Sequence, residues 1–313
     1  MRQYIIKRIG LMFILVLGMT FIVFASLYIS SGDPAEMAAG ASATPEDIQQ
    51  VRVKLGLDKP FLVQYGIYLK NLVTLDLGIS YTTRQPILSE IAVRLPHTIN
   101  LALSSMLLAV LIGIPTGIIT ALNKDKFLDN VLSTGAMVGI SIPNFWLGTM
   151  LIYVFSVLLR WLPSGGMTEP FWTLTGFRQA ILPSVALSTA TVASFTRIGR
   201  SAMLDVMQSD YIRTARAKGL KQRAIVSIHA LRNALIPLLT QLGTSFGALL
   251  GGAIITEQVF VINGIGTYLI GAINTRNYPV VQSTVLVIAT LFIMVNLAVD
   301  ILYCLIDPRI QYT

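Results

Sequence analysis

The sequence predicts an all-α membrane protein with six transmembrane helices. Of the 313 residues, 54% are hydrophobic and only 12% are charged, and the mean hydropathy is +0.71, which is more apolar than a soluble surface tolerates. Six apolar stretches approach the ~20 residues that a helix needs to cross a bilayer. They cover residues 9–30, 98–122, 131–159, 181–196, 234–256 and 283–306.

Residues 1–30 are predicted to form the first transmembrane helix. A basic head with Arg2, Lys7 and Arg8 precedes the apolar run, as it does in a secretory signal peptide. The run is longer than the ~7–15 apolar residues of a signal peptide, and no A-x-A cleavage site follows it. A retained helix is therefore favoured over the alternative, a cleaved signal.

Residues 31–97 form the one long connection, and we expect a small folded extracellular segment there. Turn signals alternate with short amphipathic helices, one of which is predicted to begin at Thr44. An apolar face is available to hold these helices together. It would consist of Tyr65, Tyr68, Leu69, Leu72 and Leu75. Residues 98–313 then make up a core of five helices that contains the basic loop 197–235.

The short connections distribute their lysines and arginines unevenly, which predicts the orientation. One side holds fourteen, eight of them between Arg197 and Arg232, and the other side holds three: Arg160, Arg178 and Arg276. The richer side is cytoplasmic by the positive-inside rule, so both termini are predicted to be cytoplasmic. The formal charge of +8 suits anionic lipid better than nucleic acid, because no basic patch is interleaved with aromatic residues.

Small residues and prolines within the spans predict helices that pack closely against other helices. Prolines at positions 115, 143 and 237 each remove a backbone hydrogen bond inside or at the mouth of a span, which neighbouring helices or a cavity must compensate. Glycines recur with the small-x-x-x-small spacing that lets two backbones approach. These are Gly113 and Gly117, Gly135 and Gly139, and Gly243, Gly247 and Gly251.

The fourth span is rich in hydroxyl groups. Its hydroxyls either bond to their own backbone, the favoured interpretation, or line a polar path. They belong to Ser188, Thr189, Thr191 and Ser194.

The sequence lacks the residue patterns that nucleotide-binding, metal and catalytic sites require. The chain contains no G-x-x-x-x-G-K-[ST] motif for a nucleotide, and His97 and His229 are predicted on opposite sides of the membrane, which leaves no metal site. The sole cysteine, Cys304, is interpreted as a small buried hydrophobe. Asp300 is an intramembrane carboxylate, for which a structural bond to a neighbouring helix is favoured over a role in transport. An intramembrane enzyme is disfavoured because the spans pair no nucleophile with a base.

The densest basic stretch, 209–232, contains a predicted helix of about eight residues, ~12 Å long. Ser209 or Asp210 can cap its start and Gly219 can end it in the left-handed conformation. Such a helix is too short and too basic to enter the membrane. We expect the small side chains of Ala215 and Ala217 to leave room for the groove of a partner protein to close around this helix. Its charge leaves partner docking and lipid anchoring equally favoured.

The order of residues in this stretch resembles a known family. D-Y-I-R-T-A-R-A-K-G-L followed by H-A-L-R-N-A-L-I-P is similar to the cytoplasmic coupling loop of ABC importer permeases, in the branch that carries peptides, nickel and glutathione. The general signature is E-A-A-x-x-x-G followed by a proline, matched here up to Gly219 and Pro237. Its glutamate and one alanine are replaced by Arg213 and Thr214, as is usual in the peptide branch.

The resemblance covers nearly the whole chain. SGDPAEM matches a P-G-D-P-A segment, with Ser31 for the proline, and RLPHTINLAL and SIPNFWLG resemble the entries to the second span and the third-span turn. The stretch G-G-A-I-I-T-E-Q-V-F-V-I-N-G-I-G at 251–266 resembles the region between the last two spans. Asn263 stands there in place of a common proline.

The resemblance implies an ABC importer fold and a non-catalytic membrane subunit that works by alternating access in a bacterial cytoplasmic (inner) membrane. It implies a heterodimer with a sister permease, two cytoplasmic ATPases that carry ATP and Mg, and an extracellular or periplasmic substrate-binding protein. No cofactor or metal is implied in this chain. The residues implied to couple it to the ATPases are Asp210, Tyr211, Arg213, Thr214, Ala215, Arg216, Lys218 and Gly219.

The substrate implied first is a short peptide, with a nickel or other metal chelate, or glutathione, as the alternative. Asn144, Thr149, Thr189 and Gln241 are candidates to line the substrate route, although roles in helix packing are equally favoured for each. A secondary carrier or a passive channel is the competing interpretation from a different class.

Overall fold

The computed structural model describes residues 2–29, 33–40 and 42–306, with the surroundings of side chains described for 10–26, 33–40, 42–299 and 301. Apart from one isolated bridge between Ile79 and Pro86, the regular structure of these residues is helical. The helices are α1 (Arg2–Ile29), α2 (Pro34–Ala39), α3 (Pro45–Lys54), α4 (Phe61–Val73), α5 (Ile87–Leu122), α6 (Phe127–Ser141), α7 (Asn144–Leu151), η1 (Ile152–Leu158), α8 (Leu174–Met207), α9 (Asp210–Ala217), α10 (Gln222–Ala224), η2 (Ile225–Ala230), α11 (Leu231–Val259), α12 (Ile265–Asn274) and α13 (Tyr278–Ile306).

Four helices are long and apolar enough to cross a membrane within the described part of the chain. They cover Ile87–Leu122, Leu174–Met207, Gln222–Val259 and Tyr278–Val299. In α1 the described side chains form a shorter apolar helix, Gly10–Ser26. Four of the six predicted spans therefore lie within long helices, and each of these helices is longer than its predicted span.

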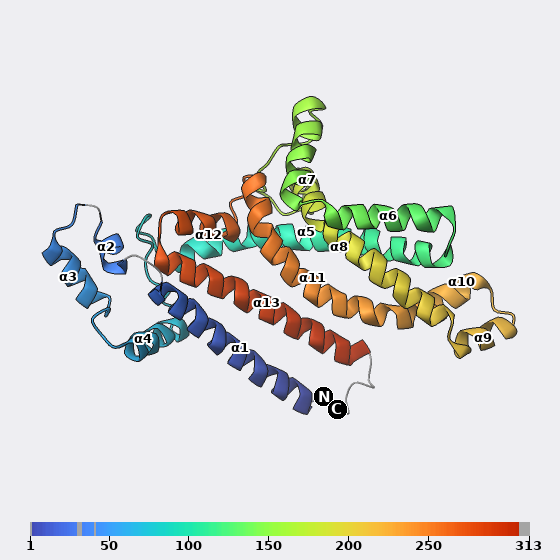
Figure 1. Cartoon of the computed structure of the whole chain (residues 1–313), viewed down its shortest axis with the longest axis horizontal. Helices are drawn as coiled ribbons and strands as arrows, with labels where there is room; N and C mark the ends of the chain where they lie inside the picture. The colour runs from blue at the N-terminus through green and yellow to red at the C-terminus, as the bar shows by residue number, and fades with distance from the viewer. Residues whose placement is uncertain (1, 30–32, 41, 307–313) are drawn as a thin grey trace.

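The predicted span over 131–159 is sharply bent at the proline that was expected to interrupt it. The segment Phe127–Ser141 is followed by Asn144–Leu158, and the two are bent by 102° relative to each other. The break falls at Ile142 and Pro143, both in extended conformation, because proline disfavours helix in the residue before it and lacks the N–H that would continue the ladder. In Figure 1, α7 starts against the bundle and the segment continues upward from it, away from the direction of α6. An apolar run reports hydrophobicity and cannot reveal such a bend.

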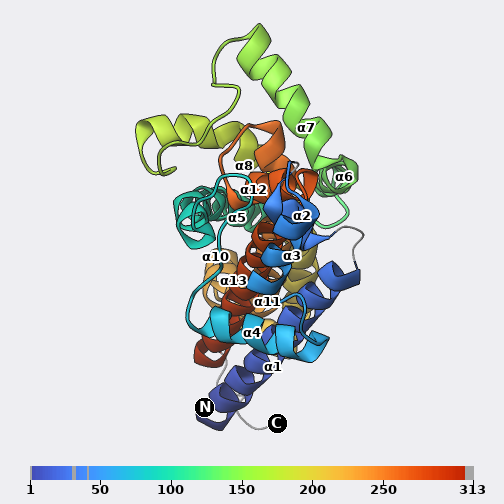
Figure 2. The same ribbon diagram turned by 90° about the vertical axis from the view of Figure 1, so that its left-hand side faces the viewer.

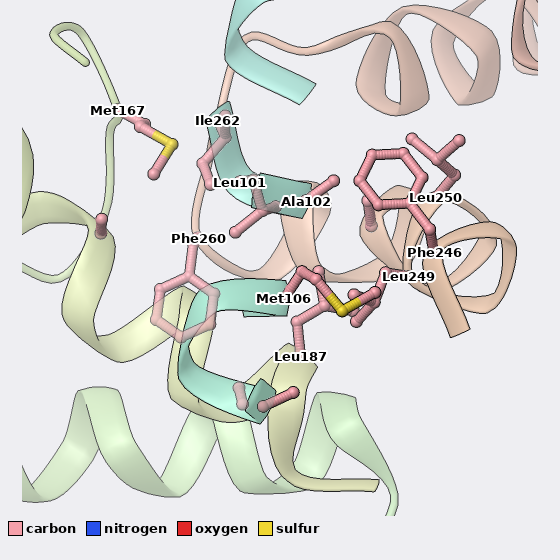
Figure 3. Close-up of a cluster of buried hydrophobic side chains, with 14 of the residues drawn as sticks. Leu101, Ala102, Met106, Met167, Leu187, Phe246, Leu249, Leu250, Phe260 and Ile262 are labelled. Carbon is pink, nitrogen blue, oxygen red and sulfur yellow. The ribbon is translucent and has the colours of Figure 1, made fainter. Parts of the chain in front are cut away.

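Helix α8 lies at the centre of the bundle and contacts α5, α6, α7 and α11, whereas α1 lies beside α13 (Figure 1). Seen from the side, α4 crosses in front of α1 and α13 (Figure 2). The largest hydrophobic core joins α5, α8 and α11 and includes Leu101, Leu187 and Phe246 (Figure 3). Between helices that cross a bilayer, such a core stabilises the fold through close van der Waals packing rather than through removal of apolar surface from water. This core therefore holds the three longest central helices as one body.

Glycines let α5 approach α8 and α11 approach α13. A Cβ on Gly113 would lie 2.7 Å from the Phe195 Cβ, and one on Gly117 would lie 2.7 Å from the Thr196 carbonyl oxygen. Gly243 and Gly247 face α13 in the same way, whereas Gly135 and Gly251 face open space. The small-x-x-x-small interpretation is therefore confirmed for the first pair and for two members of the last set.

Substituting Gly113 by alanine should destabilise the fold by about 1–3 kcal/mol, because the added methyl overlaps backbone and Cβ atoms that cannot move independently. Gly135→Ala is the matched control, since no atom lies within 4 Å of its Cβ position. It should be neutral or slightly stabilising, because alanine has the higher helix propensity. Unfolding of both variants in detergent measures the difference, and equal stability would contradict the close-packing account.

The segment between α1 and α5 contains α2, α3 and α4. Thr44 forms a capping box with Asp47, so the helix predicted to begin there is confirmed. Tyr65 and Tyr68 of α4 pack against Phe24 of α1 with ring centroids 5.5 Å apart. Leu75 was predicted on the same face but is 66% exposed, since α4 ends at Val73 and the backbone turns left-handed at Leu75.

Some sequence predictions fall outside the described residues. The placements of Ser31, Asp307 and Arg309 are not described, nor are the side-chain surroundings of Asp300 and Cys304 or of the basic head Arg2, Lys7 and Arg8.

Candidate functional site

Helix α9 begins and ends where the sequence predicts. Ser209 occupies the N-cap position in extended conformation, but its hydroxyl donates back to the Val206 carbonyl oxygen (2.6 Å) rather than accepting from the helix. Gly219 adopts a φ of +77° and its N–H donates to the Arg216 carbonyl oxygen (2.9 Å). A left-handed glycine after the last turn is the usual way for a helix to reverse the chain.

One face of α9 is anchored in the protein's own core. Ile212 is fully buried and Ala215 nearly so, and both belong to a cluster with Met203 of α8, Ile225 of η2 and Ala234 of α11. Ala215 therefore packs against the chain's own helices, and its part in coupling to an ATPase stays a prediction. Ala217 is exposed as expected. Sequence analysis missed Ile212, although its i, i+3 spacing to Ala215 signals a buried stripe.

The opposite face of α9 is polar and open. Arg213, Thr214 and Arg216 are exposed, as are Lys218 and Gly219 directly after the helix. Arg213 pairs with Asp210 at 3.2 Å between their side-chain N and O atoms, with both side chains largely in solvent. Such a surface pair contributes little to stability. The exposed face thus remains available to a partner.

Tyr211 links α9 to the helix that follows it. Its hydroxyl accepts a hydrogen bond from the Asn233 amide of α11 (2.7 Å) and contacts the His229 carbonyl oxygen at 3.5 Å. His229 belongs to η2, a π-helical segment that runs directly into α11. π-Helical turns inside longer helices are frequent at functional sites. Tyr211 and the apolar cluster that includes Ile212 thus connect α9 to η2 and α11.

The four candidates for the substrate route lie on three helices, α7, α8 and α11. The hydroxyls of Thr149 and Thr189 donate to carbonyl oxygens one turn back in their own helices, at 2.9 and 2.6 Å. Gln241 of α11 donates to the hydroxyls of Ser194 on α8 (3.1 Å) and Ser245 (2.9 Å). Asn144 begins α7. The favoured interpretation of the fourth span holds for Ser188 and Thr189, whose hydroxyls bond to the Val185 carbonyl oxygen.

Glu257 is a buried carboxylate whose role the sequence did not reveal. It is 0% exposed; its Oε1 accepts from the Thr98 hydroxyl of α5 (2.5 Å) and its Oε2 from the Thr267 N–H of α12 (3.0 Å). Thr98 in turn accepts from the Ile265 N–H (2.9 Å). Gly264, at the N-cap of α12, has no side chain that could accept hydrogen bonds from the first N–H groups of the helix. Thr98 of α5 and Glu257 of α11 accept them instead. The sequence feature that could have pointed to this role is a single acidic residue at the end of an apolar span.

A second network at the same end joins α5 to α12. The Tyr268 hydroxyl donates to Oε2 of Glu90 (2.5 Å), and the Arg94 guanidinium lies 4.4 Å from the centre of the Tyr268 ring. Burial raises the pKa of Tyr268, and its bond to the Glu90 carboxylate raises it further. The tyrosine therefore remains a hydrogen-bond donor at any physiological pH. Hydrogen bonds and a cation–π contact thus attach α12, which lies between α11 and α13 in the chain, to α5.

Two family models match the chain. The first, binding-protein-dependent transport system inner membrane component, matches residues 113–312. The second, the N-terminal part of the membrane component of binding-protein-dependent transport systems, matches residues 1–102.

The chain is similar over its full length to characterised relatives. It is 42% identical to a dipeptide transport system permease protein, DppB, of Alkalihalophilus pseudofirmus, covering 100% of both chains. It is also 42% identical to the glutathione transport system permease protein GsiC of Escherichia coli, again over 100% of both. The di/tripeptide permease DppB of Pseudomonas aeruginosa is 42% identical over 100% of this chain and 99% of the relative. In fold, the chain resembles a chain from an inward-facing structure of the MetNI methionine ABC transporter, with a TM-score of 0.60 and 19% identity, covering 71% of this chain and 99% of that one.

Proposed function

The chain belongs to the family of inner membrane components of binding-protein-dependent transport systems, and from this premise we propose that it is the permease subunit of an ATP-driven importer for short peptides. It supplies the transmembrane route, whereas partner subunits bind and hydrolyse ATP with Mg. The observation that carries the coupling mechanism is the division of α9 into a buried apolar face and an open cationic face.

Helix α9 and Gly219 form the docking element for a cytoplasmic ATPase. The exposed cations Arg213, Arg216 and Lys218 complement acidic rims of a groove, while Ile212 fixes the helix to η2 and α8. When two ATPases close on ATP, each pushes its docking element as a rigid body, and the push reaches the spans through η2 and α11. The left-handed turn at Gly219 sets the angle at which the partner meets the chain.

The complete importer contains a sister permease, two ATPases and an external substrate-binding protein. In the proposed topology both termini are cytoplasmic, residues 1–30 form the N-terminal transmembrane helix, 31–97 a folded external segment and 98–313 the five-helix transporting core. This orientation places α9 in the cytoplasm and α12 with the Glu257 cap on the external side, where the binding protein delivers its ligand. The bacterial cytoplasmic membrane is the site of action.

Short peptides are proposed as substrates because relatives named for dipeptides and for di- or tripeptides match the chain end to end. Glutathione, itself a tripeptide, is the second candidate, since a relative named for it is equally identical. A metal chelate is the third. Binding proteins set much of the choice in such systems, so the test requires the whole complex.

Uptake by the importer reconstituted in vesicles separates these candidates. With ATP inside and the binding protein outside, we expect a radiolabelled dipeptide to accumulate and excess unlabelled dipeptide to compete. Accumulation of glutathione or of a nickel chelate without dipeptide uptake would overturn the peptide assignment. Accumulation that continues without ATP and ATPases would instead identify a secondary carrier or channel and overturn the importer mechanism.

A further inference from the structure

A groove between α6 and α8 has no role in the function proposed above. It encloses about 490 Å³ and is lined on one side by α6 and its preceding loop and on the other by α8, two helices that lie side by side (Figure 1). Its two halves differ in chemistry. One half is charged and lies toward the α9 end of the bundle; the other is apolar and runs toward the α6–α7 bend.

A fixed ion pair forms the floor of the charged half. The Asp129 carboxylate is 2% exposed and accepts two hydrogen bonds from Arg200, from Nε to Oδ1 at 2.8 Å and from Nη2 to Oδ2 at 2.7 Å. The Ser133 hydroxyl and the Asp125 N–H donate to the same carboxylate at 3.1 and 3.0 Å. These four donors hold Asp129 and Arg200 in a fixed geometry, and the ion pair as a whole is neutral.

Positive charge remains after this pairing. The Arg200 side chain is 30% exposed, its two bonds to Asp129 use Nε and Nη2, and the residue lines the groove. Arg197 lies almost one turn earlier on α8, is exposed, and makes no ion pair among the described residues. Lys124 and Lys126 flank the lining residue Asp125. Within the lining itself Arg197 and Arg200 are balanced by Asp125 and Asp129, so the positive excess of this region comes from the two exposed lysines next to Asp125 in the chain.

The apolar half continues the groove between α6 and α8 toward the α6–α7 bend. Ala136, Met137 and Ile140 line it from α6 and Ala193 from α8. Met137 is 69% exposed and Ile140 46% exposed. An apolar channel of this kind, opening beside a cationic mouth, matches a molecule with an anionic head and a hydrocarbon chain.

We propose that this groove binds an anionic phospholipid, with the phosphate at Arg197 and Arg200 and an acyl chain along Ala136, Met137 and Ile140. The lysine and arginine distribution places the mouth in the cytoplasmic leaflet, whose surface is rich in anionic lipid. Basic pockets between transmembrane helices on that side are the usual sites for such head groups. The bound lipid would brace α6 against α8 below the bend.

Lipid titration of the full-length chain in mild detergent, followed by native mass spectrometry, tests the proposal. Phosphatidylglycerol should bind more tightly than phosphatidylcholine of the same chain length. Arg197→Gln should weaken phosphatidylglycerol binding about fivefold, the usual contribution of one basic residue at an anionic surface. The variant should fold, because Arg197 is exposed and surface substitutions are well tolerated.

Two further variants keep the result interpretable. Arg223→Gln removes an exposed cation of the same basic loop outside the groove and should leave lipid binding unchanged. Ala136→Phe fills the apolar half and should weaken phosphatidylglycerol binding while leaving charge intact. Equal binding by all variants, or equal loss in Arg197→Gln and Arg223→Gln, would overturn the site. Full displacement of the lipid by millimolar inorganic phosphate would show a bare anion site instead, and would overturn the lipid assignment.

Discussion

Gly219→Arg should abolish most substrate uptake while leaving the protein inserted and the partner ATPases active. Gly219 has a φ of +77°, a conformation that costs a residue with a Cβ about 1–2 kcal/mol. An arginine there also projects from the turn that follows the proposed docking helix. Beyond the neighbouring residues in the chain, no atom lies within 4 Å of its Cβ position, so the side chain leaves the turn into open space, where the proposed partner would meet it. We expect uptake to fall about tenfold or more, the effect of ~1.4 kcal/mol on docking.

The matched control is Gly219→Asn, because asparagine tolerates the left-handed conformation and adds a small side chain. It should retain most of the uptake. Transport into proteoliposomes and ATP hydrolysis, measured on the same preparations, give the two readouts. Undiminished uptake by the arginine variant would contradict the docking role of this turn. Equal loss in both variants would assign the effect to the backbone and contradict a steric clash with the ATPase.

Glu257→Leu should destabilise the protein by about 3 kcal/mol. The substitution leaves the Thr98 hydroxyl and the Thr267 N–H, both recorded as donors to the carboxylate, without acceptors in a buried site. Each buried donor that loses its partner costs about 1–3 kcal/mol. Because these bonds attach α12 to α5 and α11, we expect α12 to loosen first. Denaturation of the purified chain in detergent measures the loss, and hydrogen exchange locates it.

Two controls frame this experiment. Glu257→Gln keeps one acceptor oxygen and should fall between the wild-type protein and the leucine variant. Glu46→Leu changes an exposed glutamate in the first turn of α3 and should alter stability by no more than about 0.5 kcal/mol. A leucine variant at position 257 as stable as the wild type, or no more exchange in α12 than elsewhere, would refute the capping role.

The turn at Gly219 and the bend at Pro143 illustrate what sequence patterns can and cannot predict. Gly219 was correctly predicted to end α9, because a left-handed helix end depends on a few adjacent residues. Pro143 was recognised as a break, yet the 102° change of direction was not. Proline ends a hydrogen-bond ladder wherever it stands, whereas the direction of the next helix depends on what that helix packs against.

The candidate site, too, was predicted only in part from the sequence. The basic face of α9 was apparent from Arg213, Arg216 and Lys218, whereas the packing of Ala215 in the chain's own core was not. A helix of eight residues with both apolar and charged positions has two possible orientations in its surroundings. Sequence periodicity identifies the two faces without stating which one is buried.

By itself, then, the sequence determined that this is a helical membrane protein, where most of its long helices lie, which end carries the positive charge, and the family to which it belongs. These properties follow from local quantities: hydropathy, residue spacing and short motifs. Only the tertiary structure decided that Glu257 caps α12 with help from Thr98, that Asp129 holds Arg200 beside a groove, and that Ile212 fixes α9 to η2. Each of these joins residues from separate helices, and no local pattern encodes the distance between them.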